Sequence, residues 1–426
     1  MALTFSALGL SPELAGAAAA LGFTAPTPVQ VQAIPAALRG ADVLASAPTG
    51  SGKTASYALP LLQSLQMGAP GTPRQLRGLV VVPTRELAAQ VGEVIRSLAR
   101  HLPQSVKVAT LFGGVSINPQ MMALRGGADV VIATPGRLLD LAGHNALTLA
   151  AVQMLVLDEA DRLLDLGFAE ELHRVLALLP AQRQTLLFSA TFPPAIQSLA
   201  HTFLHEPACL EITHSASPAT SVPLAIEQRV IQVDAALRTP LLRHLIKTHG
   251  YQRVLVFVAT QYAAEHLAEK LYKTGIFATP FHGGLSQGAR TQALAEFKAD
   301  RWDVLVTTDL AARGIDIVQL PVVVNYDLPR SAVDYVHRMG RTGRAGEAGL
   351  AISFVSADTE AHFRLIEKRQ QLSLPREQIA GFEPKEIQAS HPDLAPVPGT
   401  GGIKGKRPSK KDKLRAAQAV AADQAH

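Results

Sequence analysis

The segment Ala47-Pro48-Thr49-Gly50-Ser51-Gly52-Lys53-Thr54 decides how the rest of the sequence is understood. It follows the apolar run Val43-Leu44-Ala45 and opens a stretch, 55–65, with a helical pattern. A strand, a glycine-rich loop and a helix N-terminus form a phosphate cradle, because glycines let backbone N–H groups turn inward and the helix dipole adds positive potential. Lys53 can then reach the outer phosphates, and the Thr54 hydroxyl can ligate Mg²⁺. The alternative is an ordinary glycine–serine turn between a strand and a helix.

A proline-rich segment, 22–30, lies just ahead of this loop. It holds one aromatic ring, Phe23, and one amide, Gln30, in a connector stiffened by Pro26 and Pro28. A stacked ring and an amide that both donates and accepts are what an adenine edge requires. A plain proline-rich connector is the alternative, but the position before a phosphate loop favours base recognition.

Composition indicates a globular protein of more than one domain. The chain has 426 residues, 47% of them hydrophobic and 18% charged, enough for two or three domains with real cores. No uncharged apolar run is long enough to span a bilayer, so no membrane-spanning segment is expected. No Lys or Arg precedes Arg39, so no secretory signal is expected. The single cysteine, Cys209, excludes an internal disulfide framework and fits a reducing compartment. We therefore expect a cytoplasmic protein.

The net charge of +5 is concentrated at the C-terminal end. Residues 404–426 contain seven Lys and Arg residues against two Asp, so residues 1–403 sum to about zero. The body therefore cannot bind polyanions through a bulk field and would need donors placed in a cleft. The basic tail is either an arm for RNA or a solvated disordered end.

Short apolar runs alternate with helical patterns in both halves of the chain. In the first half they lie at 79–82, 106–111, 130–133, 154–157 and 185–189, and in the second at 254–258, 304–306, 322–325 and 351–354. This alternation predicts an α/β fold with two doubly wound, mostly parallel sheets. The expected domains are 1–212, whose base-recognition segment is 3–31, and 224–375, with a linker at 213–223 and an extension and basic tail at 376–426.

Chemistry-bearing residues follow the predicted strands, where ligands of such sheets bind. Asp158-Glu159-Ala160-Asp161 follows a buried run, so one acid can hold Mg²⁺ and a second can orient a water. A solvated acidic helix start is the alternative. Ser189-Ala190-Thr191 ends the next strand and could link the site to a partner surface, or could simply cap a helix before Pro193-Pro194.

The second half has no matching phosphate loop but contributes arginines. Arg341 and Arg344, within 337–344, are spaced i, i+3 and project the same way if they are helical. Two co-directed guanidiniums suit the charge of a transferring phosphoryl group. A pair of surface arginines is the alternative.

Taken together, this set resembles the DEAD-box ATP-dependent RNA helicases, and more specifically their bacterial RhlE-like members, over about residues 5–370. That family commonly carries alanine at the position of Ala47, where the strict phosphate-loop pattern has glycine. The matching motifs occur in family order: Phe5 with 22–30, 47–54, 83–87, Gly113-Gly114, 134–137, 158–161, 189–191, 256–258, 282–290, 307–316 and 337–344.

The resemblance implies two tandem RecA-like domains and a role for each matching residue. ATP would bind at Phe23, Gln30, Ala47, Pro48, Thr49, Gly50, Ser51, Gly52, Lys53 and Thr54, and Thr54 and Asp158 would hold Mg²⁺. The catalytic residues would be Lys53, Asp158, Glu159, Asp316, His337, Arg341 and Arg344, with Glu159 positioning the attacking water. RNA would contact Thr84, Arg85, Gly114, Thr134, Arg137, Gln287, Arg290 and Thr308. Asp161, Ser189 and Thr191 would couple the two halves, at a seam shared with His337.

The expected function is ATP-dependent, local and sequence-independent unwinding of structured or duplex RNA, or remodelling of RNA–protein complexes. The expected cofactors are ATP and Mg²⁺, and ribosomal or degradation-complex proteins are possible partners. Two other functions stay open: an ATP-gated RNA clamp that does not unwind, and a DNA helicase.

Overall fold

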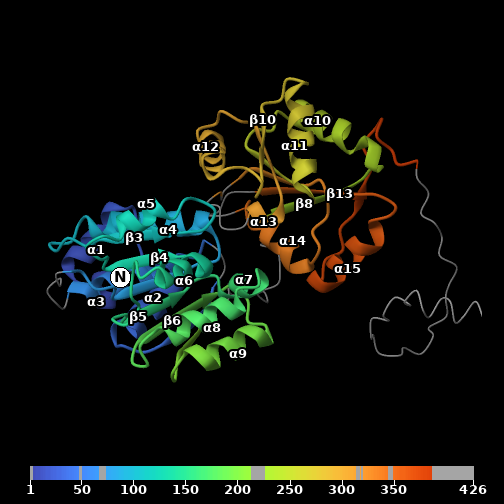
Figure 1. Cartoon of the computed structure of the whole chain (residues 1–426). Helices are drawn as coiled ribbons and strands as arrows, with labels where there is room; N and C mark the ends of the chain where they lie inside the picture. The colour runs from blue at the N-terminus through green and yellow to red at the C-terminus, as the bar shows by residue number, and fades with distance from the viewer. Residues whose placement is uncertain are drawn as a thin grey trace, which may run out of the picture. The chain divides into compact units, whose positions relative to one another are not determined.

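The computed structural model describes residues 3–47, 50–66, 73–212, 226–312, 317, 320–343 and 349–385. Two seven-stranded sheets organise these residues, and both belong to the compact unit Met1–Glu386. In Figure 1, helices lie along both faces of each sheet. The predicted fold of two tandem doubly wound domains is confirmed. The linker 213–223 and the tail from 386 onward lie outside the described residues.

The first sheet has the order β3-β4-β2-β5-β6-β1-β7, and every neighbouring pair is parallel. Its strands are β1 (Val43–Ser46), β2 (Gly78–Val81), β3 (Val108–Leu111), β4 (Val130–Ala133), β5 (Met154–Leu157), β6 (Gln184–Ser189) and β7 (Ala208–Glu211). The helices around it are α1 (Pro12–Ala20), α2 (Pro28–Leu38), α3 (Lys53–Gln66), α4 (Arg85–Ala99), α5 (Asn118–Ala123), α6 (Pro135–Gly143), α7 (Ala160–Asp165), α8 (Ala169–Ala177) and α9 (Pro194–Phe203).

The second sheet repeats this arrangement with the order β10-β11-β9-β12-β13-β8-β14, again with parallel pairs. Its strands are β8 (Ile226–Gln232), β9 (Val254–Phe257), β10 (Ala278–Phe281), β11 (Val304–Thr307), β12 (Val322–Asn325), β13 (Gly349–Val355) and β14 (Arg376–Glu377). Its helices are α10 (Arg238–His249), α11 (Gln261–Tyr272), α12 (Gln287–Lys298), α13 (Asp309–Ala312), α14 (Ala332–Met339) and α15 (Glu360–Gln370).

Alternation along the buried strands builds a core on each face of the sheet. In β5, Val156 joins the core formed with α2, α3 and α4, whereas Leu155 and Leu157 join the opposite core with α6, α8 and α9. Strands that are buried on both faces therefore consist of continuous apolar runs, and such runs can be predicted as strands from the sequence. The same division holds in the second sheet.

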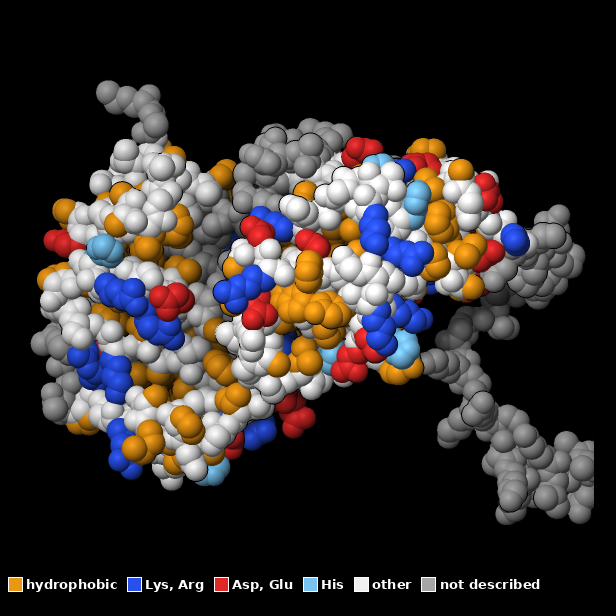
Figure 2. Space-filling view, turned by 90° about the horizontal axis from the view of Figure 1, so that it is seen from above, with side chains coloured by type: hydrophobic (Ala, Val, Ile, Leu, Met, Phe, Trp, Pro, Cys, Tyr) orange, Lys and Arg blue, Asp and Glu red, His pale blue; other side chains and the backbone are white. Residues whose placement is uncertain are grey.

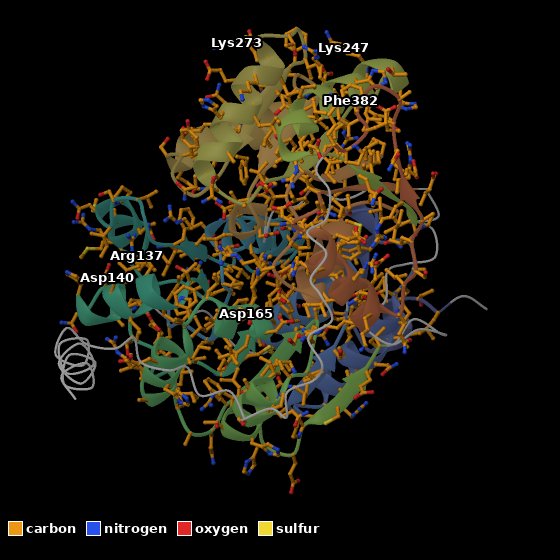
Figure 3. All side chains as sticks on the ribbon, turned by 90° about the vertical axis from the view of Figure 1, so that its right-hand side faces the viewer. Arg137, Asp140, Asp165, Lys247, Lys273 and Phe382 are labelled. Atoms are coloured by element: carbon orange, nitrogen blue, oxygen red, sulfur yellow. The ribbon has the colours of Figure 1, made fainter. Side chains whose placement is uncertain are left out.

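The second sheet continues past the expected boundary at residue 375. Strand β14 pairs with β8. The side chain of Phe382 is labelled in Figure 3, and its ring centroid lies 5.2 Å from that of His244 on α10. The Lys385 backbone N–H donates to Asp234 at 2.8 Å. The start of the predicted extension therefore packs on the second domain, and the domain boundaries themselves stay predictions.

Candidate functional site

The phosphate loop follows β1, which lies between β6 and the edge strand β7 in the first sheet. The backbone N–H of Ala47 donates to Ser189 on β6 at 3.0 Å, so the loop starts beside the end of the neighbouring strand. Gly50 and Gly52 have φ values of 79° and 93°, which favour glycine. The buried Lys53 side chain turns back, and its Nζ donates to the Ala47 carbonyl at 3.0 Å. Pro48 and Thr49 lie outside the described residues.

Gln30 joins the proline-rich segment to this loop. It lies in the first turn of α2, where its Oε1 accepts from the Thr27 N–H at 2.9 Å in a capping box. Its Nε2 donates to the carbonyl of Gly52 at 3.1 Å, and a Cβ at Gly52 would lie 2.5 Å from that nitrogen. The Phe23 ring is partly buried, with its centroid 6.5 Å from that of Phe5. Contact between Gln30 and an adenine edge stays a prediction.

Asp158 follows β5 and is almost fully buried. Its Oδ1 accepts from the Glu159 N–H at 2.9 Å, and its Oδ2 accepts from the Tyr57 hydroxyl at 2.8 Å. Burial raises the pKa of Asp158 to about 6, with Glu159 adding to the shift and Lys53 opposing it. The alternative of a solvated acidic helix start does not apply here, because this carboxylate faces the protein interior.

This carboxylate should cost stability, which Asp158→Asn would recover. The folded-state pKa of about 6 lies above the ordinary aspartate pKa of 3.8, so ionisation disfavours the fold as pH rises through this window. At 1.36 kcal/mol per unit, the full cost above pH 6 is on the order of 3 kcal/mol. We expect Asp158→Asn to raise the unfolding midpoint in chelator, more at pH 8 than at pH 5. Thermal unfolding would measure this, with the exposed Asp140→Asn as control, and a lower midpoint at pH 8 would contradict it.

Glu159 is held in an uncommon backbone conformation, with φ 50° and ψ 53°, at the N-cap of α7. A non-glycine residue there costs free energy that the surrounding structure must offset, as occurs at functional sites. Its side chain pairs with Arg162. Burial opposes ionisation, but Arg162, Lys53 and Arg341 outweigh it, so the pKa of Glu159 lies below its ordinary value. The side chain is therefore an ionised carboxylate at neutral pH.

Asp161, Ser189 and Thr191 form one hydrogen-bonded group. The N–H and hydroxyl of Thr191 both donate to Oδ2 of Asp161, at 3.1 and 2.9 Å. The Ser189 hydroxyl donates to the Thr191 carbonyl at 2.8 Å and accepts from the Asp161 N–H at 3.3 Å. Since α9 begins at Pro194 without a side-chain cap, these hydroxyls are not its N-cap.

The second domain brings His337 and Arg341 to these acids. Burial lowers the pKa of His337, while Asp161 opposes the shift and Arg162 adds to it. The charge of Arg341 lowers the pKa of Glu159. Residues from α14 and the turn after it therefore lie within electrostatic reach of the segment 158–161.

The helical condition under which Arg341 and Arg344 would project the same way is not met at Arg341. Helix α14 ends at Met339, and Gly340 is its C-cap, so Arg341 lies in the following turn. Arg344 and Asp316 lie outside the described residues. The i, i+3 argument for a common direction therefore fails, whereas the role of each arginine stays a proposal.

Arg338 is a residue of this region to which the sequence argument gave no role. It is 2% exposed, and its Nε and Nη2 bind the Asp309 carboxylate at 2.5 and 2.7 Å. Its Nη1 donates to Asn325 at 2.8 Å, and its guanidinium lies 4.7 Å from the ring centre of Phe257. Arg338 thus fixes α13 against α14. Its position inside 337–344 was the available signal, but burial is not visible in the sequence.

The predicted RNA residues of the first domain lie at the starts of helices. Thr84 caps α4, with its hydroxyl accepting from the Leu87 N–H at 3.3 Å. Thr134 is the N-cap residue of α6, and Arg137 on that helix donates to the Val115 carbonyl at 2.8 Å. Arg137 also lies 3.5 Å from Asp140, one turn later (Figure 3). These helix starts are suited to phosphate.

Gly114 makes room for Arg85. Its φ of 73° favours glycine, and an added Cβ would overlap the Arg85 guanidinium. We expect Gly114→Ala to displace Arg85 and to weaken RNA affinity by roughly tenfold, the effect of losing about 1.4 kcal/mol. Gly113→Ala is the matched control, because a Cβ there meets nothing within 4 Å. Fluorescence anisotropy with single-stranded RNA measures both, and equal affinities would contradict the assignment of Arg85.

Two of the three predicted RNA residues of the second domain contact an acid of the first. Arg290 Nη2 lies 3.0 Å from Oε1 of Glu86, and Gln287 Nε2 donates to the same oxygen at 3.4 Å. Thr308 is buried at the start of α13, where its carbonyl accepts from the Ala312 N–H at 2.9 Å. RNA contact by these residues stays a prediction.

The residues proposed for Mg²⁺ fit that ion. The hydroxyl of Tyr57 donates to Asp158 at 2.8 Å, and Thr54 is near enough to lower the pKa of the same phenol, so the two oxygen ligands lie close together. Mg²⁺ is usually held by one or two carboxylates together with substrate phosphates and water. Among the described residues, no group of three or more His, Cys, Asp or Glu is placed to hold a metal ion.

The surface seen in Figure 2 carries Lys and Arg in separate small groups among apolar and uncharged side chains. This agrees with a body of near-zero net charge. Within the described ranges, none of the helices combines the length and apolarity of a membrane span.

Comparison with protein families finds two matches along the chain. Residues 27–199 match the DEAD/DEAH box helicase family, and residues 238–346 match the helicase conserved C-terminal domain. The chain is 40% identical to an ATP-dependent rRNA helicase, rrp3, from Sclerotinia sclerotiorum, over 91% of this chain and 80% of that protein. It is also 40% identical to the ATP-dependent RNA helicase DeaD of Mycobacterium tuberculosis, over 91% of this chain and 67% of the relative.

Two solved structures share the fold. Dbp5 of S. cerevisiae bound to RNA and ADP BeF3 matches with a TM-score of 0.76 and 31% identity, over 88% of this chain and 95% of that one. Mss116p bound to ssRNA and AMP-PNP matches with a TM-score of 0.79 and 29% identity, over 89% and 80%.

Proposed function

Because this chain belongs to the DEAD-box family of ATP-dependent RNA helicases, we propose that it separates RNA strands locally by closing its two domains on ATP and one RNA strand. As a member of this family the chain is an enzyme, an RNA-stimulated ATPase. The bacterial RhlE-like subtype stays a prediction. The proposal concerns how ATP, Mg²⁺ and RNA act together on the residues described above.

The observation that carries the proposal is that the two domains meet in direct contact, because Arg290 and Gln287 of the second bind Glu86 of the first. The charge of Arg341 also lowers the pKa of Glu159, and that of Asp161 opposes the lowered pKa of His337. ATP would bind in the phosphate loop, and hydrolysis would need an arginine from the other domain. Such an arginine contributes about 10³–10⁵ in rate in related NTPases. An enzyme with separated domains should therefore hydrolyse ATP slowly.

Each residue has a definite part in this scheme. Lys53 binds the outer phosphates, and Glu159 accepts a hydrogen bond from the attacking water and holds it in line. Mg²⁺, when bound to Thr54 and Asp158, would neutralise charge on the β- and γ-phosphates. Arg341, with Arg344, stabilises the charge of the transferring group. The hydrogen-bonded group of Asp161, Ser189 and Thr191 couples the two domains, because closure places His337 next to Asp161.

RNA would stabilise the closed arrangement by contacting both domains. By linkage, ATP must then strengthen RNA binding by the same factor. Contacts to phosphates and 2′-hydroxyls are independent of sequence and favour RNA over DNA. A strand held in a path that an A-form duplex cannot follow loses its partner, and hydrolysis reopens the clamp. This gives local strand separation without long processive travel.

A strand-displacement assay tests the proposal. We expect ATP-dependent release of a strand from a short RNA duplex, a steep fall in yield with duplex length, and little release from a DNA duplex of equal sequence. ATP-dependent RNA retention without strand release would instead identify an RNA clamp, and equal release from DNA would identify a DNA helicase. Ribosomal or degradation-complex partners and a cytoplasmic location stay predictions.

A further inference from the structure

Tyr57 is a buried phenol at the centre of the candidate site. It lies in the second turn of α3, is 0% exposed, and packs its ring 5.4 Å from that of Phe188 on β6. A buried tyrosine hydroxyl requires a hydrogen-bond partner. The apolar packing alone would be met by phenylalanine, so the hydroxyl needs its own explanation.

The hydroxyl lies beside both side chains proposed to hold Mg²⁺. It donates to Oδ2 of Asp158 at 2.8 Å, and Thr54 is close enough to oppose the burial that raises the pKa of this phenol. Thr54 and Tyr57 are three residues apart on α3 and therefore share one face of the helix. The phenol thus binds the acid at the tip of β5 from the same helix face that carries Thr54.

We infer that Tyr57 is a positioning residue, which fixes the carboxylate plane of Asp158 and its spacing from Thr54 so that both face one Mg²⁺. The inference rests on the proposed ATPase function. Each oxygen of Asp158 accepts one protein hydrogen bond, Oδ1 from Glu159 and Oδ2 from Tyr57. A carboxylate oxygen has two lone pairs, so each oxygen keeps one for the ion or its water. Without the phenol, only one hydrogen bond would restrain rotation of the carboxylate.

Tyr57→Phe tests this role because it keeps the ring and deletes one oxygen. The matched control is Tyr335→Phe in the second domain. Tyr335 is also buried, its hydroxyl donates to Gln228 at 2.9 Å, and its ring lies 5.9 Å from that of Phe363. Both variants lose one buried hydrogen bond of a phenol, and only Tyr57 touches the candidate metal site.

The measurement is the binding of a fluorescent ADP to the full chain during a Mg²⁺ titration, without turnover. We expect the half-saturating Mg²⁺ concentration to rise about tenfold in Tyr57→Phe, the low end of the cost of losing an outer-shell hydrogen bond. Affinity for ADP in chelator should not change. Tyr335→Phe should keep the wild-type Mg²⁺ dependence.

Two results would overturn the inference and are distinguishable. Equal Mg²⁺ dependence in Tyr57→Phe, Tyr335→Phe and wild type would show that the phenol only ties α3 to β5, and would leave the proposed function intact. If the affinity of the wild-type protein for ADP did not depend on the Mg²⁺ concentration, the proposed role of the metal would be wrong, and the inference about Tyr57 would be wrong as well. Thermal midpoints of both variants confirm that each is folded.

Discussion

Replacing Lys53 by alanine is expected to abolish ATP hydrolysis while the protein stays folded. The ammonium is the one cation of the phosphate loop, and its bond to the Ala47 carbonyl holds it inside the loop rather than in solvent. Loss of one donor to the charge of a transition state costs about 10²–10³ in rate. Since Lys53 would also bind the ground-state phosphates, we expect the fall in kcat/KM to exceed the fall in kcat. Steady-state ATPase assays at saturating RNA measure both.

Lys107→Ala is the matched control for this experiment. Its Nζ also donates to a backbone carbonyl, that of Arg125, at 2.7 Å, but on the surface of the first domain. This variant should keep wild-type turnover. Turnover by Lys53→Ala within a few-fold of wild type would refute the assignment of residues 47–54 as the nucleotide site. Circular dichroism and thermal unfolding should show that both variants retain the fold.

The parts of this site that the sequence predicts well are those set by the parallel sheet. The carboxyl ends of parallel strands lie at the same edge of a sheet, so the sequence predicts that three features lie close together there: the phosphate loop after β1, Asp158 after β5 and Ser189 at the end of β6. The strand order explains why this holds, because β6 lies between β1 and β5. Family membership confirms the resemblance that the ordered motifs suggested, while the role of each site residue stays a prediction.

The strands that the sequence misses have weak apolar patterns. Strand β7 lies at the edge of its sheet and alternates between exposed and half-buried residues. Strand β10 is also an edge strand, and it contains Pro280. Proline is disfavoured in central strands, so the sequence offered no reason to predict a strand there. Strand β8 carries Glu227, Gln228 and Arg229 in its first half. Tertiary pairing, rather than local preference, decides these three elements.

Side-chain contacts between distant segments are the other part that sequence reasoning could not supply. Tyr57 is 101 residues from Asp158, and nothing in the α3 pattern separates a buried phenol with a polar partner from a core ring. The direction of Arg341 and Arg344 was open for a related reason. The two residues project the same way only if both are helical, and the sequence did not show that α14 ends at Met339, two residues before Arg341.

The two domains use the same architecture for different chemistry. The first carries a phosphate loop after β1, whereas the corresponding strand β8 of the second leads into Asp234 and a short 3-10 turn, Ala235–Leu237. The second domain instead presents His337 and Arg341 after β12, the counterpart of β5. In the proposed mechanism, an active site divided in this way would make hydrolysis depend on domain closure, which RNA binding would control.

Glu159→Gln is expected to leave nucleotide and RNA binding intact while turnover falls about 10²–10⁴-fold, the contribution of a positioned general base. Glutamine keeps the volume of the side chain and the N-cap conformation of α7, but it cannot accept a proton from water. Because the unhydrolysed ATP stays in the closed site, RNA should dissociate more slowly in ATP than in ADP. Stopped-flow release of labelled RNA measures this rate, and single-turnover ATP cleavage measures the chemical step.

The control for Glu159→Gln must separate the loss of charge from the loss of the pair with Arg162. Glu170→Gln, an exposed acid in the first turn of α8, changes the net charge equally and should behave as wild type. Arg162→Gln breaks the ion pair but keeps the carboxylate, so it should retain more turnover than Glu159→Gln. If Glu159→Gln released RNA equally fast in ATP and in ADP, Glu159 would not be required for the hydrolysis step that separates domain closure from reopening. The water would then have to be positioned by another acid of 158–161, either Asp158, which is proposed to hold Mg²⁺, or Asp161, which already binds Thr191.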